Sequence, residues 1–153
     1  SLKQVLESAG VSLTFRNCSS LNALCQGANY ITEIGELDFS TVTKVNSTSL
    51  FPQCYSLKSI DKIILPPTQT TFSDWFTDCT ALENVIFEGT INANNFNISA
   101  SPLNQASLAS IVDCLANRTG QSVYTVTLGQ ANIDKLSEQQ IATITQTKGW
   151  TLA

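Results

Sequence analysis

A ladder of aromatic, cysteine, leucine and aliphatic residues, set at steps of three, recurs three times in the chain and constrains its fold more than any other feature. The copies are Phe51, Cys54, Leu57 and Ile60, then Phe76, Cys79, Leu82 and Val85, and earlier Phe15, Cys18, Leu21 and Leu24. Cys54 and Cys79 are 79 − 54 = 25 residues apart, and Cys18 and Cys54 are 54 − 18 = 36 apart. One period is therefore about 25 residues, a length typical of coils that stack into a solenoid.

The longer first interval indicates an insertion of roughly 11 residues near 25–33. Loops of this kind often carry binding residues, so Tyr30 is a candidate contact; the alternative is that its ring folds back over the core. Ahead of the repeats, the pattern from Ser1 to Gly10 predicts a short capping helix, and 11–15 alternates like a brief strand. We therefore expect one domain, with an N-terminal cap over 1–14, repeats over 15–100 and a C-terminal cap over 101–153.

Two strands are predicted inside the repeats, over 58–65 and 82–88. Alternation places four side chains in the core, those of Ile63, Leu65, Val85 and Phe87. It turns five side chains outward, those of Lys62, Ile64, Asn84, Ile86 and Glu88. Two outward isoleucines in adjacent coils would form a small apolar stripe, which is either a contact strip for a partner or a surface covered by the N-terminal segment or a neighbouring domain.

After Gly89 the pattern predicts a helix, a strand, a second helix and a last strand. Asn104 or Ser107 can cap the first helix. The strand over 122–128 is expected in the same sheet as the repeat strands, with Thr125 and Thr127 extending the outward row. The second helix opens at Ser137, and the last strand begins at Trp150. A tail of this kind would cover the open end of a solenoid.

Seven residues of the ladder are interpreted as structural, namely Cys18, Cys54, Cys79, Phe51, Phe76, Leu57 and Leu82. Buried free thiols fit the cysteine column because Cys is among the most often buried residues. A disulfide between stacked positions is the alternative, and only geometry decides it. The chain has five cysteines, no His and no close cysteine pair, which disfavours a zinc site. We expect no metal and no cofactor.

The charge pattern argues against two classes of partner. Charged residues make up 13% of the chain, about half the usual share, and the net charge is −4. The eight Lys and Arg are not clustered, so we expect no nucleic acid and no anionic lipid as partner. No apolar run approaches the length of a membrane span. A neutral, polar surface favours an extracellular or cell-surface location, with any targeting signal outside this sequence.

The motif Phe51-x-x-Cys54-x-x-Leu57-x-x-Ile60, followed by an aliphatic-x-aliphatic-Pro run, resembles BspA-like leucine-rich repeats of bacterial surface proteins. The segment from Ile34 to Cys54 is similar to a subgroup of these repeats. The segments 101–120, 127–130 and 148–152 resemble the C-terminal cap of leucine-rich surface and prophage-encoded proteins of anaerobic gut bacteria. The resemblance covers about residues 15–153. It implies an α/β solenoid with short parallel strands on one face, no catalysis and no cofactor.

The resemblance implies a noncatalytic recognition or adhesion module of a bacterial cell-surface or secreted protein, binding a protein or glycan on a host or neighbouring cell. The alternative is a phage or prophage tail component that binds a receptor, which would place the domain on the virion. A glycan-cleaving enzyme is the third hypothesis. It needs two carboxylates across a cleft, which pairs such as Asp74 and Asp78 do not establish, and triads of the serine or cysteine type need a His that the chain lacks.

Overall fold

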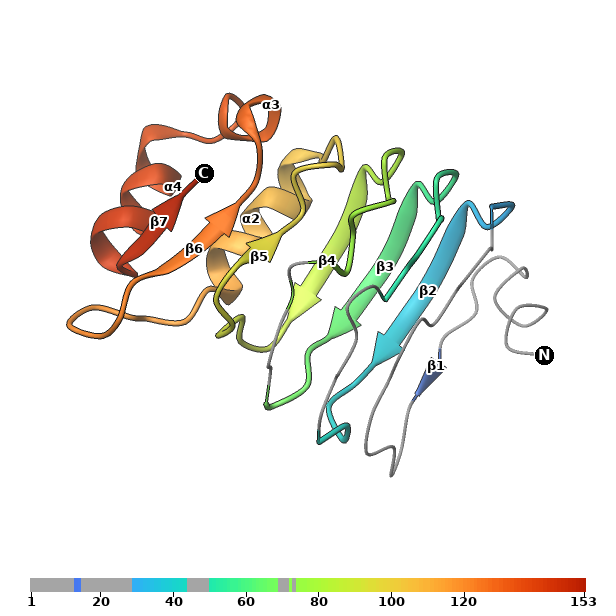
Figure 1. Cartoon of the computed structure of the whole chain (residues 1–153), viewed down its shortest axis with the longest axis horizontal. Helices are drawn as coiled ribbons and strands as arrows, with labels where there is room; N and C mark the ends of the chain where they lie inside the picture. The colour runs from blue at the N-terminus through green and yellow to red at the C-terminus, as the bar shows by residue number, and fades with distance from the viewer. Residues whose placement is uncertain (1–12, 15–28, 44–49, 69–71, 73) are drawn as a thin grey trace.

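The structure, a computed structural model, describes residues 13–14, 29–43, 50–68, 72 and 74–153 (Figure 1). Its strands and helices are β1 (Leu13–Thr14), β2 (Glu33–Asp38), β3 (Ser59–Ile64), β4 (Asn84–Glu88), β5 (Phe96–Asn97), α2 (Gln105–Cys114), β6 (Tyr124–Thr127), α3 (Gln130–Ile133), α4 (Glu138–Ala142), a π-helical turn (Thr143–Thr147) and β7 (Trp150–Leu152). The helix expected over 1–10, the residue Cys18 and the first part of the insertion lie outside the described residues.

The first sheet consists of four parallel strands in chain order, β1 to β4, so each turn of the chain adds the next strand beside the last (Figure 1). The strands predicted over 58–65 and 82–88 are β3 and β4. One main-chain hydrogen bond repeats from turn to turn: Lys58 N donates to Thr32 O at 2.8 Å, Glu83 N to Lys58 O at 2.9 Å, and Asn104 N to Glu83 O at 2.7 Å. The solenoid as a fold class stays a prediction.

The repeated ladder forms the centre of the core. Its described members are buried to 0% exposure, namely Phe51, Cys54, Leu57, Ile60, Phe76, Cys79, Leu82 and Val85. The rings of Phe51 and Phe76 stack at 5.6 Å between centroids, so equivalent positions of successive turns lie against each other. Cys54 and Cys79 are free thiols, which confirms the structural interpretation of these two cysteines over the disulfide alternative.

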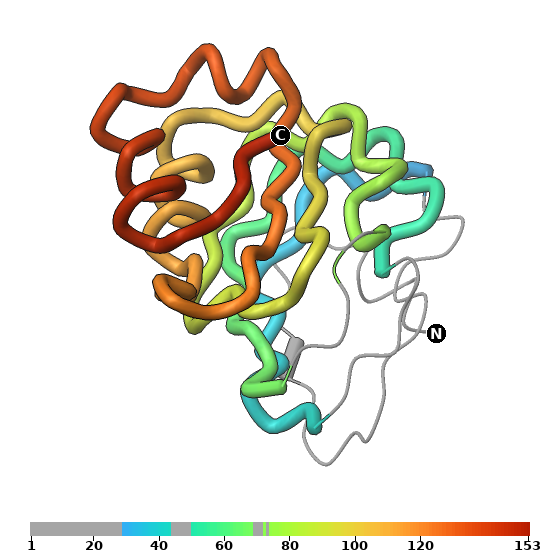
Figure 2. Tube along the Cα trace, turned by 60° about the vertical axis from the view of Figure 1, so that its left-hand side comes forward, coloured from blue at the N-terminus to red at the C-terminus, as the bar shows by residue number. Residues whose placement is uncertain are grey.

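The C-terminal part contains a second parallel sheet in the order β5-β6-β7. In Figures 1 and 2 these strands and α4 lie together, in yellow to red, at the side of the molecule away from β2. The strand expected over 122–128 exists as β6, but its placement in the first sheet is wrong. The outer edge of β4 is occupied by α2 instead: Val85 N donates to Ser107 Oγ at 2.8 Å, and Phe87 N donates to Ser110 Oγ at 3.2 Å.

The helices of this part begin and end with specific side-chain contacts. Asn104 caps α2 as predicted, because its Oδ1 accepts from Ser107 N at 2.9 Å. Ser137 and Gln140 form a capping box at the start of α4. At the other end of α2, Lys148 Nζ donates to the carbonyls of Val112, Asp113 and Leu115 at 2.6 to 2.8 Å. These contacts dock the last helical segment onto α2 and complement the negative end of its dipole.

Candidate functional site

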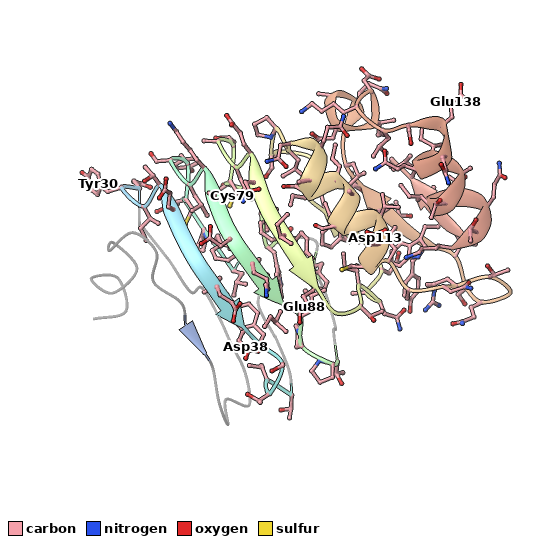
Figure 3. All side chains as sticks on the ribbon, turned by 180° about the vertical axis from the view of Figure 1, so that it is seen from behind. Tyr30, Asp38, Cys79, Glu88, Asp113 and Glu138 are labelled. Atoms are coloured by element: carbon pink, nitrogen blue, oxygen red, sulfur yellow. The ribbon has the colours of Figure 1, made fainter. Side chains whose placement is uncertain are left out.

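The outward side of the first sheet is the surface on which most of the predicted binding residues lie. We call it the strand face and define it by the outward side chains of β2, β3 and β4, which are Glu36, Asp38, Lys62, Ile64, Ile86 and Glu88. Their inward neighbours Leu37, Ile63 and Phe87 are buried, so the alternation predicted from the sequence is confirmed. Figure 3 shows the three strands side by side with α2 next to β4, and Asp38 and Glu88 toward the same end of the strands.

Strand register fixes which of these side chains are neighbours. Asp38 pairs with Ile64, and Ile64 pairs with Glu88, so Ile64 lies between two acidic residues. The register shifts between Ile60 and Ile63, from an offset of 85 − 60 = 25 residues to one of 87 − 63 = 24. Ile86 is therefore diagonal to Ile64. The continuous apolar stripe expected from the sequence is wrong, because the shift separates the two isoleucines with charged side chains.

A three-residue ion pair crosses the strand face. Lys62 Nζ lies 3.2 Å from Glu88 Oε2 and 3.3 Å from Glu36 Oε2, and it thereby links β2, β3 and β4. Hydrogen bonding to Glu88 and then to Glu36 raises the pKa of Lys62 above its ordinary value. Because all three side chains are more than a third exposed, water and salt screen the attraction. The pair sets the positions of the charges more than it stabilises the fold.

The remaining predicted binding residues lie in different places. Thr125 and Thr127 belong to β6 in the second sheet, so they do not extend the strand face. The side chain of Asn84 is engaged: its Nδ2 donates to Ser59 Oγ at 3.1 Å and its Oδ1 accepts from Asn104 Nδ2 at 3.2 Å. Tyr30 precedes β2 and is 82% exposed, which contradicts the alternative that its ring folds over the core (Figure 3).

Glu36 and Asp38 belong to the strand face and were not among the predicted binding residues. The signal for them is present in the sequence, since Ile34, Leu37 and Phe39 are the buried partners around them. The insertion ahead of β2 concealed it, because the ladder places Leu24 opposite Ile60, whereas the residue paired with Ile60 is Ile34. Matching the strands instead of the ladder would have found both acids.

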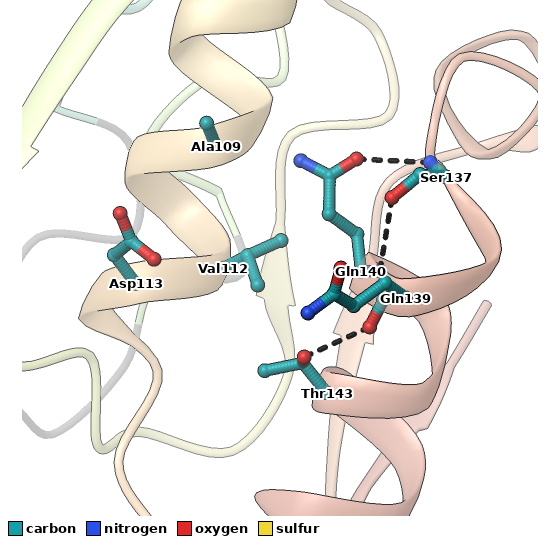
Figure 4. Close-up of a pocket in the computed structure, with 7 residues that line it drawn as sticks. All are labelled: Ala109, Val112, Asp113, Ser137, Gln139, Gln140 and Thr143. Atoms are coloured by element: carbon teal, nitrogen blue, oxygen red, sulfur yellow. Dashed lines mark hydrogen bonds between the residues drawn. The ribbon is translucent and has the colours of Figure 1, made fainter.

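A second hollow lies between α2 and α4, with a volume of about 200 Å³ (Figure 4). Asp113 is its only carboxylate, and the remaining lining residues are neutral. Two-carboxylate glycoside hydrolysis needs a second acid across the cleft, so this hollow gives the glycan-cleaving hypothesis no support. Within the described part of the chain, no group of three His, Cys, Asp or Glu side chains could hold a metal ion, and no helix is long and apolar enough to cross a membrane.

Comparison with known proteins finds no match: no family model, no curated protein sequence and no solved structure matches the chain.

Proposed function

We propose that the chain is a noncatalytic recognition module, a leucine-rich repeat domain of a bacterial surface or secreted protein, which binds a protein or glycan on a host or neighbouring cell through its strand face. The observation that carries the proposal is the composition of that face. Ile64 and Ile86 are partly exposed among Glu36, Asp38, Lys62 and Glu88. Apolar contact residues inside a polar rim are the usual anatomy of a protein recognition surface.

The backing of the strand face supports the same proposal. Each strand is hydrogen-bonded to its neighbour, and the layer beneath consists of fully buried residues such as Leu37 and Ile60. A surface held in this way loses little conformational freedom when a partner binds, so more of the contact energy appears as affinity. Tyr30, exposed ahead of β2, would add a contact at the edge of the face.

The test is an array of host proteins, bacterial surface proteins and glycans, probed with the wild-type domain and with the double variant Ile64→Asp/Ile86→Asp. Both positions are partly exposed, so the variant is expected to fold, which circular dichroism checks. We expect the variant to lose the signals that the wild type gives, because two buried charges at the centre of an interface carry a large desolvation cost. Unchanged binding by a folded double variant would remove the strand face from consideration.

A matched control separates a general charge effect from a local one. Val123 precedes β6, away from the strand face, and its side chain is 63% exposed. Val123→Asp introduces the same charge on an exposed aliphatic residue. We expect this variant to bind like the wild type.

A further inference from the structure

The hollow between α2 and α4 combines hydrogen-bonding groups from both elements with an apolar floor. Ala109, Val112 and Asp113 share one face of α2, since they are spaced by three and four residues. Gln139, Gln140 and Thr143 face them from α4 and the turn after it (Figure 4). The volume of about 200 Å³ would hold roughly six or seven waters at the density of the liquid. This is smaller than a typical drug-sized pocket and fits one small ring.

The capping box orients a donor toward this hollow. Ser137 N donates to Gln140 Oε1 at 2.9 Å, and an N–H can be accepted only by the oxygen of that amide. The nitrogen of the amide must therefore point the other way, and Figure 4 shows it facing α2. Among the described residues, Gln140 Nε2 has no hydrogen-bond partner. The protein thus holds a free donor in a fixed orientation without any ligand present.

The acceptor comes from Asp113 on α2. No described residue donates a hydrogen bond to its carboxylate, and the side chain is exposed. Its charge is balanced nearby, because Lys148 Nζ donates to the main-chain oxygen of Asp113 at 2.7 Å. A balanced site has little attraction for a free cation, and its carboxylate repels an anion. These charges favour a neutral ligand that both donates and accepts hydrogen bonds.

We propose that this hollow binds a single neutral sugar ring, with its hydroxyls between Gln140 Nε2 and the Asp113 carboxylate and its C–H face on Val112 and Ala109. A pyranose presents this combination of hydroxyls around its rim and carbon-bound hydrogens on its faces. The site would be separate from the strand face, and it does not rest on the function proposed above. The ring could be a free monosaccharide or the terminal unit of a glycan chain, since the ligand chemistry is the same.

The test is an NMR titration of the ¹⁵N-labelled domain with methyl glycosides of glucose, galactose, mannose and N-acetylglucosamine. We expect at least one of them to shift the side-chain amide signal of Gln140, with a dissociation constant on the order of a few millimolar, as befits a ligand of this size. Free reducing sugars and oligosaccharides that end in the active unit then distinguish the two sources. N-acetylneuraminic acid, an anion, should not bind. The absence of shifts at Gln140 with every neutral sugar would overturn the proposal.

Two substitutions on α2 form a matched pair. Ala109→Leu fills the hollow and should abolish the titration, whereas Ala106→Leu adds the same side chain at an exposed position of the same helix outside the hollow and should leave it intact. Asp113→Asn keeps the size of the exposed side chain but removes its charge, and should weaken binding at least tenfold. It decides the matter if Ala109→Leu fails to fold. Wild-type binding by folded Ala109→Leu or by Asp113→Asn would contradict the assignment.

Discussion

At the scale of single residues, Lys62 decides the charge pattern of the strand face. Its ammonium lies between Glu36 on β2 and Glu88 on β4, so one side chain reaches both neighbouring strands. The three carboxylates of the face, which include Asp38, outnumber this one cation. A partner that presents basic groups at the rim and an apolar group near Ile64 would complement this arrangement.

The ion pair predicts a specific titration. Because the hydrogen bond to Glu88 is the largest cause of the raised pKa of Lys62, Glu88→Gln should lower that pKa more than Glu36→Gln does. The folded state favours the charged form, so any contribution to stability is fully present below pH 10.5 and is lost as pH rises through the raised pKa. The lysine side-chain ¹³Cε shift measures the pKa. A wild-type pKa at or below 10.5 would contradict the pairing.

The cysteine column predicts a pattern of thiol reactivity. Cys54 and Cys79 are 0% exposed, and burial raises the pKa of the Cys79 thiol, so iodoacetamide should modify neither in the native protein. Cys114 is half-buried and serves as the internal comparison, expected to react first. Peptide mapping by mass spectrometry before and after urea treatment measures this. Native labelling of Cys54 or Cys79 ahead of Cys114 would show that the column is not packed as described.

At the scale of elements, α2 takes the position that a further strand would occupy beside β4. The outward N–H groups of that strand end on serine hydroxyls, and the main-chain ladder from Thr32 ends at Asn104, the residue that caps the helix. An edge strand with unpaired N–H groups invites pairing with other chains, and these contacts satisfy two of those groups. The helix therefore ends the first sheet as well as covering the core.

This arrangement predicts the cost of removing one hydroxyl. Ser107 is fully buried, and its Oγ accepts from Val85 N, so Ser107→Ala leaves that N–H without its partner and should lower the free energy of unfolding by about 1–3 kcal/mol. Ser122→Ala, at an exposed position, should change it by less than about 0.5 kcal/mol. Urea unfolding followed by circular dichroism compares the two. Equal stability of both variants would mean that the hydroxyl at position 107 is not needed at the sheet edge.

The elements differ in how far the sequence predicts them. α2 and α4 were predicted with their caps because Asn104 and Ser137 act on residues two or three positions away. β3 and β4 followed from alternation over a few residues. The sheet to which β6 belongs depends on Ser107 and Ser110 occupying the edge of β4, a contact between segments 22 and 23 residues apart in sequence, and no local pattern carries it. α3 starts at Gly129, whose φ of 79° also has no local helix signal around it.

At the scale of the whole molecule, the period of about 25 residues determines which residues lie side by side. It places Phe51 against Phe76 and aligns Ile34, Ile60 and Val85 across three strands. The shift of one residue inside β3 could not be predicted, because both registers keep the same buried column. That shift decides the site, since it sets Ile64 between Asp38 and Glu88 and moves Ile86 to the diagonal position.

The claim that recognition takes place on the strand face is tested most directly by hydroxyl-radical footprinting of the domain alone and with a partner found on the array. We predict that the partner reduces oxidation of Ile64 and Ile86, both partly exposed in the free domain, and leaves Val123 unchanged. Unchanged oxidation at both isoleucines, with protection at Val123 instead, would contradict the account.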